Sequence, residues 1–409
     1  MKYNTATLDN GLRAIHCPSA SPVVYCGYEV CAGTRDEKKG EEGMAHFCEH
    51  TTFKGTRHRS AMQILNRLES VGGDLNAFTN KEDTVYYSAI LKDHFPRAVD
   101  LLTDIVFGST YPQAEIDKEV EVIVDEIESY NDSPAELVYD LFENAVFGGH
   151  PLGHNILGTA EKLRHYTTAD ALRFTRRYYR PENSVFFAYG DVDFARLVRL
   201  LERANTVAAD DACCACKQSA ATLPPYVAQH IEHHMDTHLA HVMVGTRAYD
   251  VHDERRIALY LLNNILGGPG MTARLNVSLR ERNALVYTVE SMAQSYSDTG
   301  LWAVYFGCDP KNVKRCLRLI RRELDKVMQR PLSDAQLRAA KRQIRGQIGI
   351  ACDSRESFAL DFAKSFLHYG WKKDVTALCE RIDALTAADL QRVAQDLFAE
   401  ECLTSLVIK

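Results

Sequence analysis

Residues 46–50 read His-Phe-Cys-Glu-His, and the interpretation of the whole chain works outward from this H-x-x-E-H stretch. Small and apolar residues around it recur at helical spacing, which predicts a helix. Residues four apart share one face of a helix, so His46 and His50 can direct their imidazoles at one metal ion. Neutral imidazole suits zinc, and Glu49 borders the same face, where a carboxylate can take a proton from an attacking water. The alternative is a helix with an ordinary solvated polar face.

The composition is that of a globular protein with two or more domains. The chain has 409 residues, 46% hydrophobic and 25% charged, and its net charge of −7 argues against nucleic-acid binding. The residues after Met1 lack the apolar run of a signal peptide, and no apolar run approaches the roughly 20 residues that span a bilayer. We therefore expect a cytoplasmic protein without a membrane span, whose twelve scattered cysteines are reduced thiols.

The first half of the chain predicts a mixture of strands and helices. An Asn-Gly turn at residues 10–11 predicts a β-hairpin over residues 5–16. Further strands are expected at residues 23–31, 75–79, 83–90 and 184–190. Besides the motif helix, helices are expected near residues 61–71, 94–107, 113–130, 134–146, 168–180 and 193–205.

The second half repeats this order of elements. Strands are expected near residues 226–233, 238–248, 286–296, 300–308 and 404–408. Helices are expected near residues 254–267, 271–283, 310–329, 333–350, 355–368 and 386–399. The repeated order predicts an α+β fold with two homologous domains, each an antiparallel-rich β-sheet with packed helices. We place a zinc-binding domain at residues 1–208, an exposed linker at 209–225 and the homologous domain at 226–409.

Three other groups of residues are poor candidates for a metal or phosphate site. Three linker cysteines form a C-C-x-C run without distant partners: Cys213, Cys214 and Cys216. Five histidines fall on two expected strands joined by a short turn, and strand alternation would divide them between faces: His230, His233, His234, His238 and His241. The glycine-rich residues 267–270 lack the Lys-Ser/Thr of a phosphate loop. We assign no metal or phosphate to these groups.

Two imidazoles alone hold zinc poorly, so a third protein ligand should exist, and the helix near residues 113–130 is rich in candidates. Glu119 and Glu126 are seven residues apart, which is two helical turns, and so share one face. An apolar stripe runs beside them, and the other acidic residues of the helix are interpreted as solvated. Spacing alone does not choose between Glu119 and Glu126.

Several stretches resemble one family of metallopeptidases. They are residues 46–50 with the following Phe-Lys-Gly-Thr at 53–56, residues 76–79 with 83–87, residues 119–126, and His-Pro-Leu-Gly at 150–153. They resemble the pitrilysin-type, insulinase-like inverzincins, in particular the half-length subgroup that contains the mitochondrial processing peptidase β subunit. The resemblance covers nearly the whole chain. It implies Glu126 as the third zinc ligand and Glu119 as a carboxylate that supports the site without holding the metal.

The stretch from Leu279 to Tyr287 resembles the arginine–tyrosine element of that family. The resemblance implies that Arg280 and Tyr287 reach the substrate at the scissile bond, where a guanidinium can bind a carbonyl and a phenol can stabilise an oxyanion. On sequence grounds alone, Arg280 would be a solvated charge at a helix end and Tyr287 a half-buried strand residue. The chain departs from the family at Asn283-Ala284, where Arg-Gly is common.

Together these features predict a zinc-dependent endopeptidase that cleaves extended peptides or unfolded segments within a closed chamber. Glu49 would take a proton from the attacking water and later protonate the leaving amine. Asn76 and Ala77 would lie on a strand edge that pairs with the extended substrate backbone.

The resemblance also implies an assembly. The chain would form half of a clamshell and close as a homodimer, each site combining Glu49 of one chain with Arg280 and Tyr287 of the other. A heterodimer is the alternative assembly. The alternative functions are a non-catalytic core or partner subunit of a larger complex and a peptide-binding module with vestigial chemistry.

Overall fold

The computed structural model describes residues 2–205 and 222–409, which form two compact units. Unit 1 comprises Met1–Glu128, His154–Ala221 and Ala351–Asp374, and unit 2 comprises Ser129–Gly153, Thr222–Ile350 and Val375–Lys409. Each unit therefore takes one segment from the part of the chain that mainly builds the other. Most of the predicted linker, with its three cysteines, lies outside the described residues, so the division at residues 209–225 stays a prediction.

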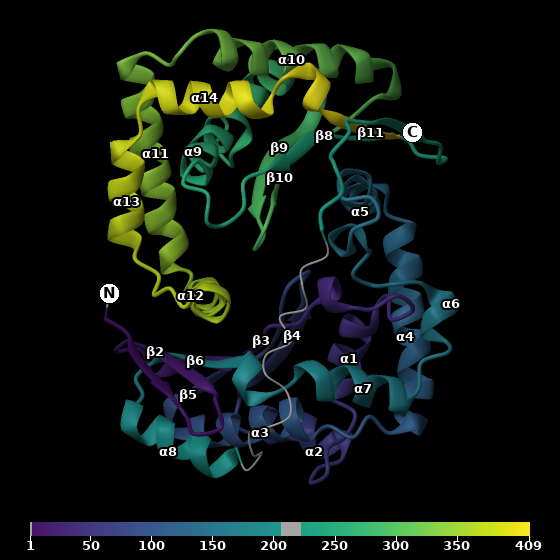
Figure 1. Cartoon of the computed structure of the whole chain (residues 1–409), viewed down its shortest axis with the longest axis vertical. Coiled ribbons are helices and arrows are strands. Elements are labelled where there is room, and N and C mark those ends of the chain that lie inside the picture. Colours follow the sequence, from purple (N-terminus) through teal and green to yellow (C-terminus); the bar gives the residue numbers. More distant parts are fainter. Residues whose placement is uncertain (1, 206–221) are drawn as a thin grey trace. The chain divides into compact units, whose positions relative to one another are not determined.

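The sheet of unit 1 has six strands in the order β1-β2-β6-β3-β5-β4 (Figure 1). They are β1 (Asn4–Thr7), β2 (Arg13–Pro18), β3 (Val23–Val30), β4 (Asp74–Thr79), β5 (Thr84–Leu91) and β6 (Ser184–Gly190). Strands β2 and β6 run parallel and the other neighbours run antiparallel. The predicted hairpin is confirmed, because Ala6 of β1 lies opposite Ala14 of β2. Strand β4 forms one edge of the sheet.

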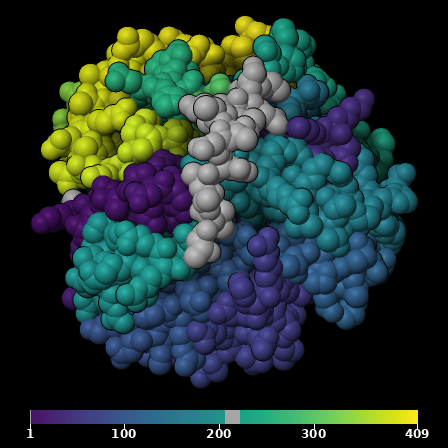
Figure 2. All heavy atoms as spheres, turned by 60° about the horizontal axis from the view of Figure 1, so that its bottom comes forward, coloured from purple at the N-terminus to yellow at the C-terminus, as the bar shows by residue number. Residues whose placement is uncertain are grey.

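Helices cover both faces of this sheet. Those mainly in unit 1 are α1 (Met44–Thr52), α2 (Ala61–Glu69), α3 (Phe95–Gly108), α4 (Gln113–Asn131), α6 (Ala160–Leu163), α7 (Thr168–Tyr178), α8 (Phe194–Ala204) and α12 (Arg355–Tyr369). Helix α3 packs on β3 and β5 and also against α8. The blue atoms of α3 and the teal atoms of α8 lie side by side on the face shown in Figure 2. Helix α12 packs on β3 and β6 (Figure 1). Along β3, the Tyr28 hydroxyl bonds Thr103 of α3, whereas the next residue, Glu29, lies near His368 of α12, so α3 and α12 cover opposite faces.

The sheet of unit 2 repeats the arrangement of the first. Its strands are β7 (His230–His233), β8 (Ala240–Ala248), β9 (Val286–Ser295), β10 (Gly300–Cys308) and β11 (Thr404–Ile408). The order β7-β11-β8-β10-β9 matches β2-β6-β3-β5-β4, and the first pair is again parallel. The predicted fold of two homologous, antiparallel-rich α+β halves is confirmed, and β1 is the additional strand of unit 1.

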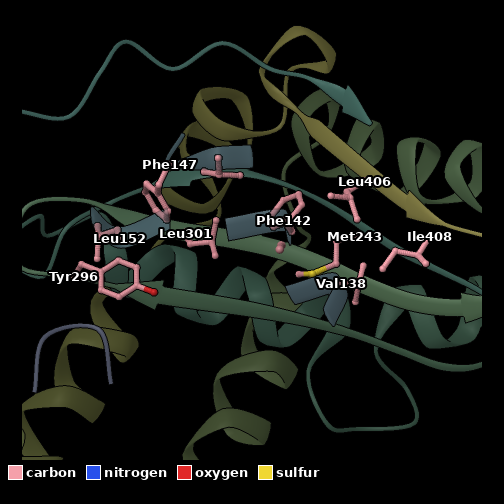
Figure 3. Packing of buried hydrophobic residues seen from close by; sticks show 11 residues of the cluster. Val138, Phe142, Phe147, Leu152, Met243, Tyr296, Leu301, Leu406 and Ile408 are labelled. Carbon is pink, nitrogen blue, oxygen red and sulfur yellow. The ribbon is translucent and has the colours of Figure 1, made fainter. Parts of the chain in front are cut away.

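One hydrophobic cluster of unit 2 lies between its sheet and α5 (Pro134–Val146). Val138 and Phe142 of α5 pack against Met243 of β8 and against Leu406 and Ile408 of β11 (Figure 3). The other helices mainly in this unit are α9 (Arg256–Gly267), α10 (Val313–Gln329), α11 (Asp334–Asp353), α13 (Val375–Ala384) and α14 (Ala387–Leu397). Among the described residues, no helix is both long enough and apolar enough to cross a membrane.

Three details differ from the sequence prediction. Strand β7 does not form a hairpin with β8, because the distant β11 pairs with both strands. The helix expected at residues 271–283 is shorter, with helical residues 274–281, of which Asn276–Glu281 form a π-helix. Helices α6 and α13 were not predicted. The other predicted helices and strands are confirmed, with bounds that shift by a few residues.

Candidate metal centre

Helix α1 carries the H-x-x-E-H stretch and has a firmly anchored start. It follows Gly43, whose φ of +88° favours glycine, and a Cβ there would lie 2.8 Å from the Cα of Gly158. The Glu37 carboxylate accepts hydrogen bonds from the backbone N–H groups of Gly43 (3.0 Å) and Ala45 (2.9 Å). These bonds satisfy donors that the first helical turn leaves without partners.

One side of α1 is buried against neighbouring elements. The ring of Phe47 packs edge-on against Tyr166, with centroids 5.4 Å apart. The Cys48 thiol donates a 3.9 Å hydrogen bond to the carbonyl of Ala171 in α7. Cys48 therefore points away from the two histidines, as the helical spacing predicts.

The other side of α1 meets α4, where Glu126 lies beside both histidines. Glu126 Oε2 is 3.8 Å from His46 Nε2 and 3.4 Å from His50 Nε2. The two imidazole centroids are 4.6 Å apart. One ligand atom from each of these three residues lies within 4.8 Å of the others, so the sequence-distant carboxylate and the two histidines form one cluster.

This cluster fits a tetrahedral zinc ion in donor type and spacing. Ligand atoms about 2.0–2.1 Å from a tetrahedral zinc lie about 3.3–3.4 Å from one another. The distance of 3.4 Å from Glu126 Oε2 to His50 Nε2 matches this value, and the 3.8 Å to His46 Nε2 is a few tenths of an ångström longer. Two imidazoles and one carboxylate also leave the fourth position free for water or substrate.

The charges of the cluster are suited to a cation. Burial and the neighbouring His50 lower the pKa of His46 to about 4, so its ring is neutral at pH 7. Burial also acts to lower the pKa of His50, but hydrogen bonds with Glu119 and Glu126 outweigh burial and raise that pKa to about 9. Without a metal, a protonated His50 contacts both carboxylates. A divalent cation displaces such a proton when it binds.

The two glutamates of α4 lie in different surroundings. Glu119 Oε1 is 3.2 Å from His50 Nδ1, and Glu119 Oε2 is 2.5 Å from Lys54 Nζ. Burial acts to raise the pKa of Glu119, but hydrogen bonds from His50 and Lys54 outweigh it and keep the pKa below its usual value. The side chain of Glu126 is 45% exposed, and in the described part of the chain it pairs with His46 and His50 only. The alternatives that spacing left open therefore differ in geometry: Glu126 faces both Nε2 atoms, and Glu119 lies behind His50.

Glu49 is buried beside the cluster and is held by a residue that the sequence did not single out. Thr79, the last residue of β4, donates a 2.8 Å hydrogen bond to Glu49 Oε2. Both residues are 9% exposed. Burial raises the pKa of Glu49, against the opposing effects of Thr79 and His50.

The same strand supplies the predicted substrate edge. Asn76 and Ala77 lie in β4, which pairs with β5 on one side and forms the edge of the sheet on the other. Asn76 is exposed and Ala77 is half-buried. Among the described residues no strand pairs with the outer side of β4, and the strand ends at the threonine that holds Glu49.

Arg280 and Tyr287 lie in unit 2, whereas the histidine cluster lies in unit 1. Arg280 is in the π-helix, and its guanidinium stacks over the Tyr287 ring at 5.5 Å from the centroid. Tyr287 is 83% exposed, so the half-buried position expected from the strand pattern alone was wrong. Ala284, at the position that departs from the family, has a φ of +49°, a conformation in which glycine is unstrained.

The histidines near residues 230–241 make separate contacts. His230 Nδ1 lies 2.8 Å from the Ser405 hydroxyl, and His241 Nδ1 lies 2.9 Å from the Tyr305 hydroxyl.

The residues that sequence reasoning missed are Thr79 and Lys54. Both fall inside stretches that resemble the peptidase family, and this resemblance is the signal by which the sequence could have identified them.

Comparisons with known proteins agree along the whole chain. Residues 15–160 match the family model described as Insulinase (Peptidase family M16), and residues 165–344 match the Peptidase M16 inactive domain. An "uncharacterized zinc protease" of Streptomyces coelicolor is 34% identical over 98% of this chain and 88% of its own length. The Bacillus subtilis protein YmxG, also called an uncharacterized zinc protease, is 31% identical over 98% of this chain and 97% of its own.

Solved structures show the same fold. A protease from Helicobacter pylori superposes with a TM-score of 0.91 at 23% identity, covering 100% of this chain and 99% of that chain. A Pseudomonas fluorescens structure titled as a peptidase M16 inactive domain also gives a TM-score of 0.91, at 17% identity over 100% and 98% of the two chains. Since the family models and relatives of similar length span nearly all of the sequence, this chain belongs to the insulinase-like peptidase family M16.

Proposed function

We propose that this protein is a zinc-dependent endopeptidase in which His46, His50 and Glu126 hold the metal. The observation that carries the proposal is the meeting of these three side chains next to the buried carboxylate of Glu49. The names of the M16 relatives, which call them zinc proteases, support the same assignment.

The chemistry requires a Lewis acid and a base. Zinc bound in the cluster would polarise a peptide carbonyl and activate a water molecule. Glu49 accepts the proton of the attacking water and delivers it to the leaving amine. Thr79 holds Glu49 Oε2, which leaves the other carboxylate oxygen free for that proton.

The substrate is an extended peptide segment. The open edge of β4 at Asn76 and Ala77 supports binding by strand addition, in which main-chain hydrogen bonds give affinity for an extended backbone. Arg280 and Tyr287 supply a cation and a phenol, which suit a substrate carbonyl and a developing oxyanion. Their mutual stacking and the exposure of Tyr287 support a role in binding rather than in the core.

We further propose that two chains complete each site. One sequence carries both the histidine cluster and the Arg280–Tyr287 pair, so a two-fold homodimer can combine the cluster of one chain with the pair of the other. A heterodimer with a second M16 chain is the alternative assembly.

Glu49→Gln tests the chemistry. The variant should bind zinc as the wild type does, because Glu49 is not a proposed ligand, and should lose about 10²–10⁴-fold in peptide cleavage. Zinc content and the hydrolysis of a quenched fluorescent peptide library are measured on the same preparation. Cleavage near the wild-type rate would refute the proposed base.

Mixing inactive chains tests the assembly. When Glu49→Gln and Arg280→Ala chains are combined, a mixed dimer has one site with both residues intact and one site with both defects. Partial recovery of cleavage is expected. If mixed dimers form and remain inactive, the site is built within one chain, and a fully active monomer rules the dimer out.

A further inference from the structure

We propose that Lys54 is the positioning residue of the metal centre: by pairing with Glu119 it keeps Glu119 on the far side of His50 and so directs His50 Nε2 at the cation. The inference rests on the zinc site proposed above. Two successive interactions carry it, one from Lys54 to Glu119 and one from Glu119 to His50.

Lys54 lies two residues beyond the end of α1, and its side chain returns toward the site. The C-terminal residue of α1 is Thr52, and the backbone N–H of Lys54 donates to the Thr51 carbonyl (3.1 Å), which continues the last turn. Its ammonium lies 2.5 Å from Glu119 Oε2, with the two side chains 27% and 12% exposed. Such a pair is partly shielded from water, so it is screened less than a surface pair.

The pairing leaves Glu119 without a free oxygen. One oxygen contacts Lys54 and the other lies 3.2 Å from His50 Nδ1. When Nδ1 donates its proton to a carboxylate, the neutral ring has its lone pair on Nε2. A histidine fixed in this tautomer and orientation is the form that binds a metal, and outer carboxylates commonly have this role.

Lys54 also makes the two glutamates unequal. Both share one face of α4, but no lysine or arginine pairs with Glu126 in the described residues. Glu126 therefore keeps its charge for a cation near the two Nε2 atoms, while the charge of Glu119 is neutralised by Lys54. The ammonium thus decides which carboxylate faces the metal.

The test is the zinc affinity of purified Lys54→Met, measured by competition with a chromophoric chelator. We expect affinity to fall about 10–100-fold, as is typical when an outer partner of a ligand is removed. Lys54→Arg, which keeps the charge, should restore most of the affinity. The matched control is Lys118→Met, which breaks an exposed pair with Glu115 (2.7 Å) on the same helix and should leave zinc affinity unchanged.

A double-mutant cycle identifies the route of the effect. Glu119→Gln should weaken zinc binding by a similar factor, and Lys54→Met should add little in that background because both act through one carboxylate. Circular dichroism confirms that each variant is folded, and Lys54→Gln replaces Lys54→Met if the latter is not.

The outcomes are distinct. Wild-type protein that binds no zinc refutes the proposed function itself. If the wild type binds zinc but Lys54→Met and Lys54→Gln bind it equally well, the inference is overturned. It is also overturned if Lys54→Met and Glu119→Gln weaken binding additively, because Lys54 would then act by a route other than Glu119.

Discussion

The described residues of unit 1 include two clusters in which imidazole and carboxylate groups converge, and they differ in what supplies the positive charge. The first is His46, His50 and Glu126, and the second is Glu29, Asp83 and His368. In the second, Lys364 Nζ lies 2.7 Å and His368 Nε2 lies 3.1 Å from Asp83 Oδ2. Glu29 and Asp83 are 1% and 0% exposed. The second cluster therefore already contains its cations, whereas Glu126 in the first is open to solvent and has no lysine or arginine partner in the described residues.

The difference shows that converging ligand atoms do not by themselves make a metal site. A buried carboxylate must be compensated, and a lysine or a protonated histidine does this as well as a metal. Asp83 precedes β5, and Lys364 and His368 belong to α12, so the second cluster fastens α12 to the sheet of unit 1. We interpret the first cluster as a metal centre and the second as a structural ion-pair network.

The largest expected effect is a loss of folding stability in the variant Asp83→Asn. This change leaves Lys364 and His368 without their shared carboxylate, and breaking a buried ion pair typically costs about 3–5 kcal/mol. Urea denaturation of the zinc-free protein measures this loss, and the folded variant should still bind one zinc per chain. A variant that loses zinc while keeping its stability would reverse the two interpretations.

The next largest effect is expected from Glu126→Gln. Zinc affinity should fall by more than about 100-fold, the upper end of the effect of removing an outer partner. The unfolding free energy of the zinc-free protein should change little, because the Glu126 side chain is 45% exposed. Glu128→Gln, at an exposed position of the same helix, is the control. Full zinc retention in Glu126→Gln would mean that this glutamate is not a ligand.

Thr79→Val tests the hydrogen bond that holds Glu49 beside the proposed metal cluster. The hydrogen bond to Glu49 involves an ionisable group, and such bonds contribute about 1.5–3 kcal/mol, so kcat should fall about 10–100-fold. KM and zinc affinity should stay near wild type, and Thr79→Ser should recover most of kcat. Equal losses in the valine and serine variants would point to packing instead of the hydroxyl.

The smallest expected effect is on the stability of Glu29→Gln, which should equal that of the wild type at pH 4. Burial, and then the charge of Asp83, raise the pKa of Glu29 well above 4.5. A carboxyl group with a raised pKa in the folded state favours folding below its unfolded pKa, and that contribution is lost as the pH rises toward the folded value. Glutamine cannot ionise, so the variant should match the wild type at pH 4 and be the more stable protein at pH 8. Thermal unfolding at both pH values measures this, and a variant less stable at pH 8 would show that Glu29 is ionised.

Local patterns were sufficient to predict most of the elements and half of the candidate site. The Asn-Gly turn at residues 10–11 and the spacing of His46 and His50 involve neighbours along the chain, and both are found as expected. The choice between Glu119 and Glu126 was different, because both share one face of α4. It depends on which glutamate faces the two Nε2 atoms once α4 packs beside α1, and spacing contains no information about that packing.

Long-range pairing was the part that the sequence did not reveal. Strand β7 pairs with β11 through residues such as His230 and Ser405, which are 175 positions apart, so the nearby β8 was the mistaken partner. The contact between Asp83 and His368 spans 285 positions. Such contacts depend on the packing of whole elements, and no period in the sequence indicates them.

The exchange of segments between the units has a consequence for biosynthesis. The sheet of unit 1 and its histidine cluster are complete once β6 and α8 have left the ribosome, but the helix that neutralises Asp83 belongs to residues 351–374. At the usual 5–20 residues per second, roughly 8–34 s pass before that helix emerges. During this interval Asp83 has no ammonium partner and one face of the sheet has no cover. Chaperones and proteases can then reach this face of the nascent chain until α12 emerges and packs on it.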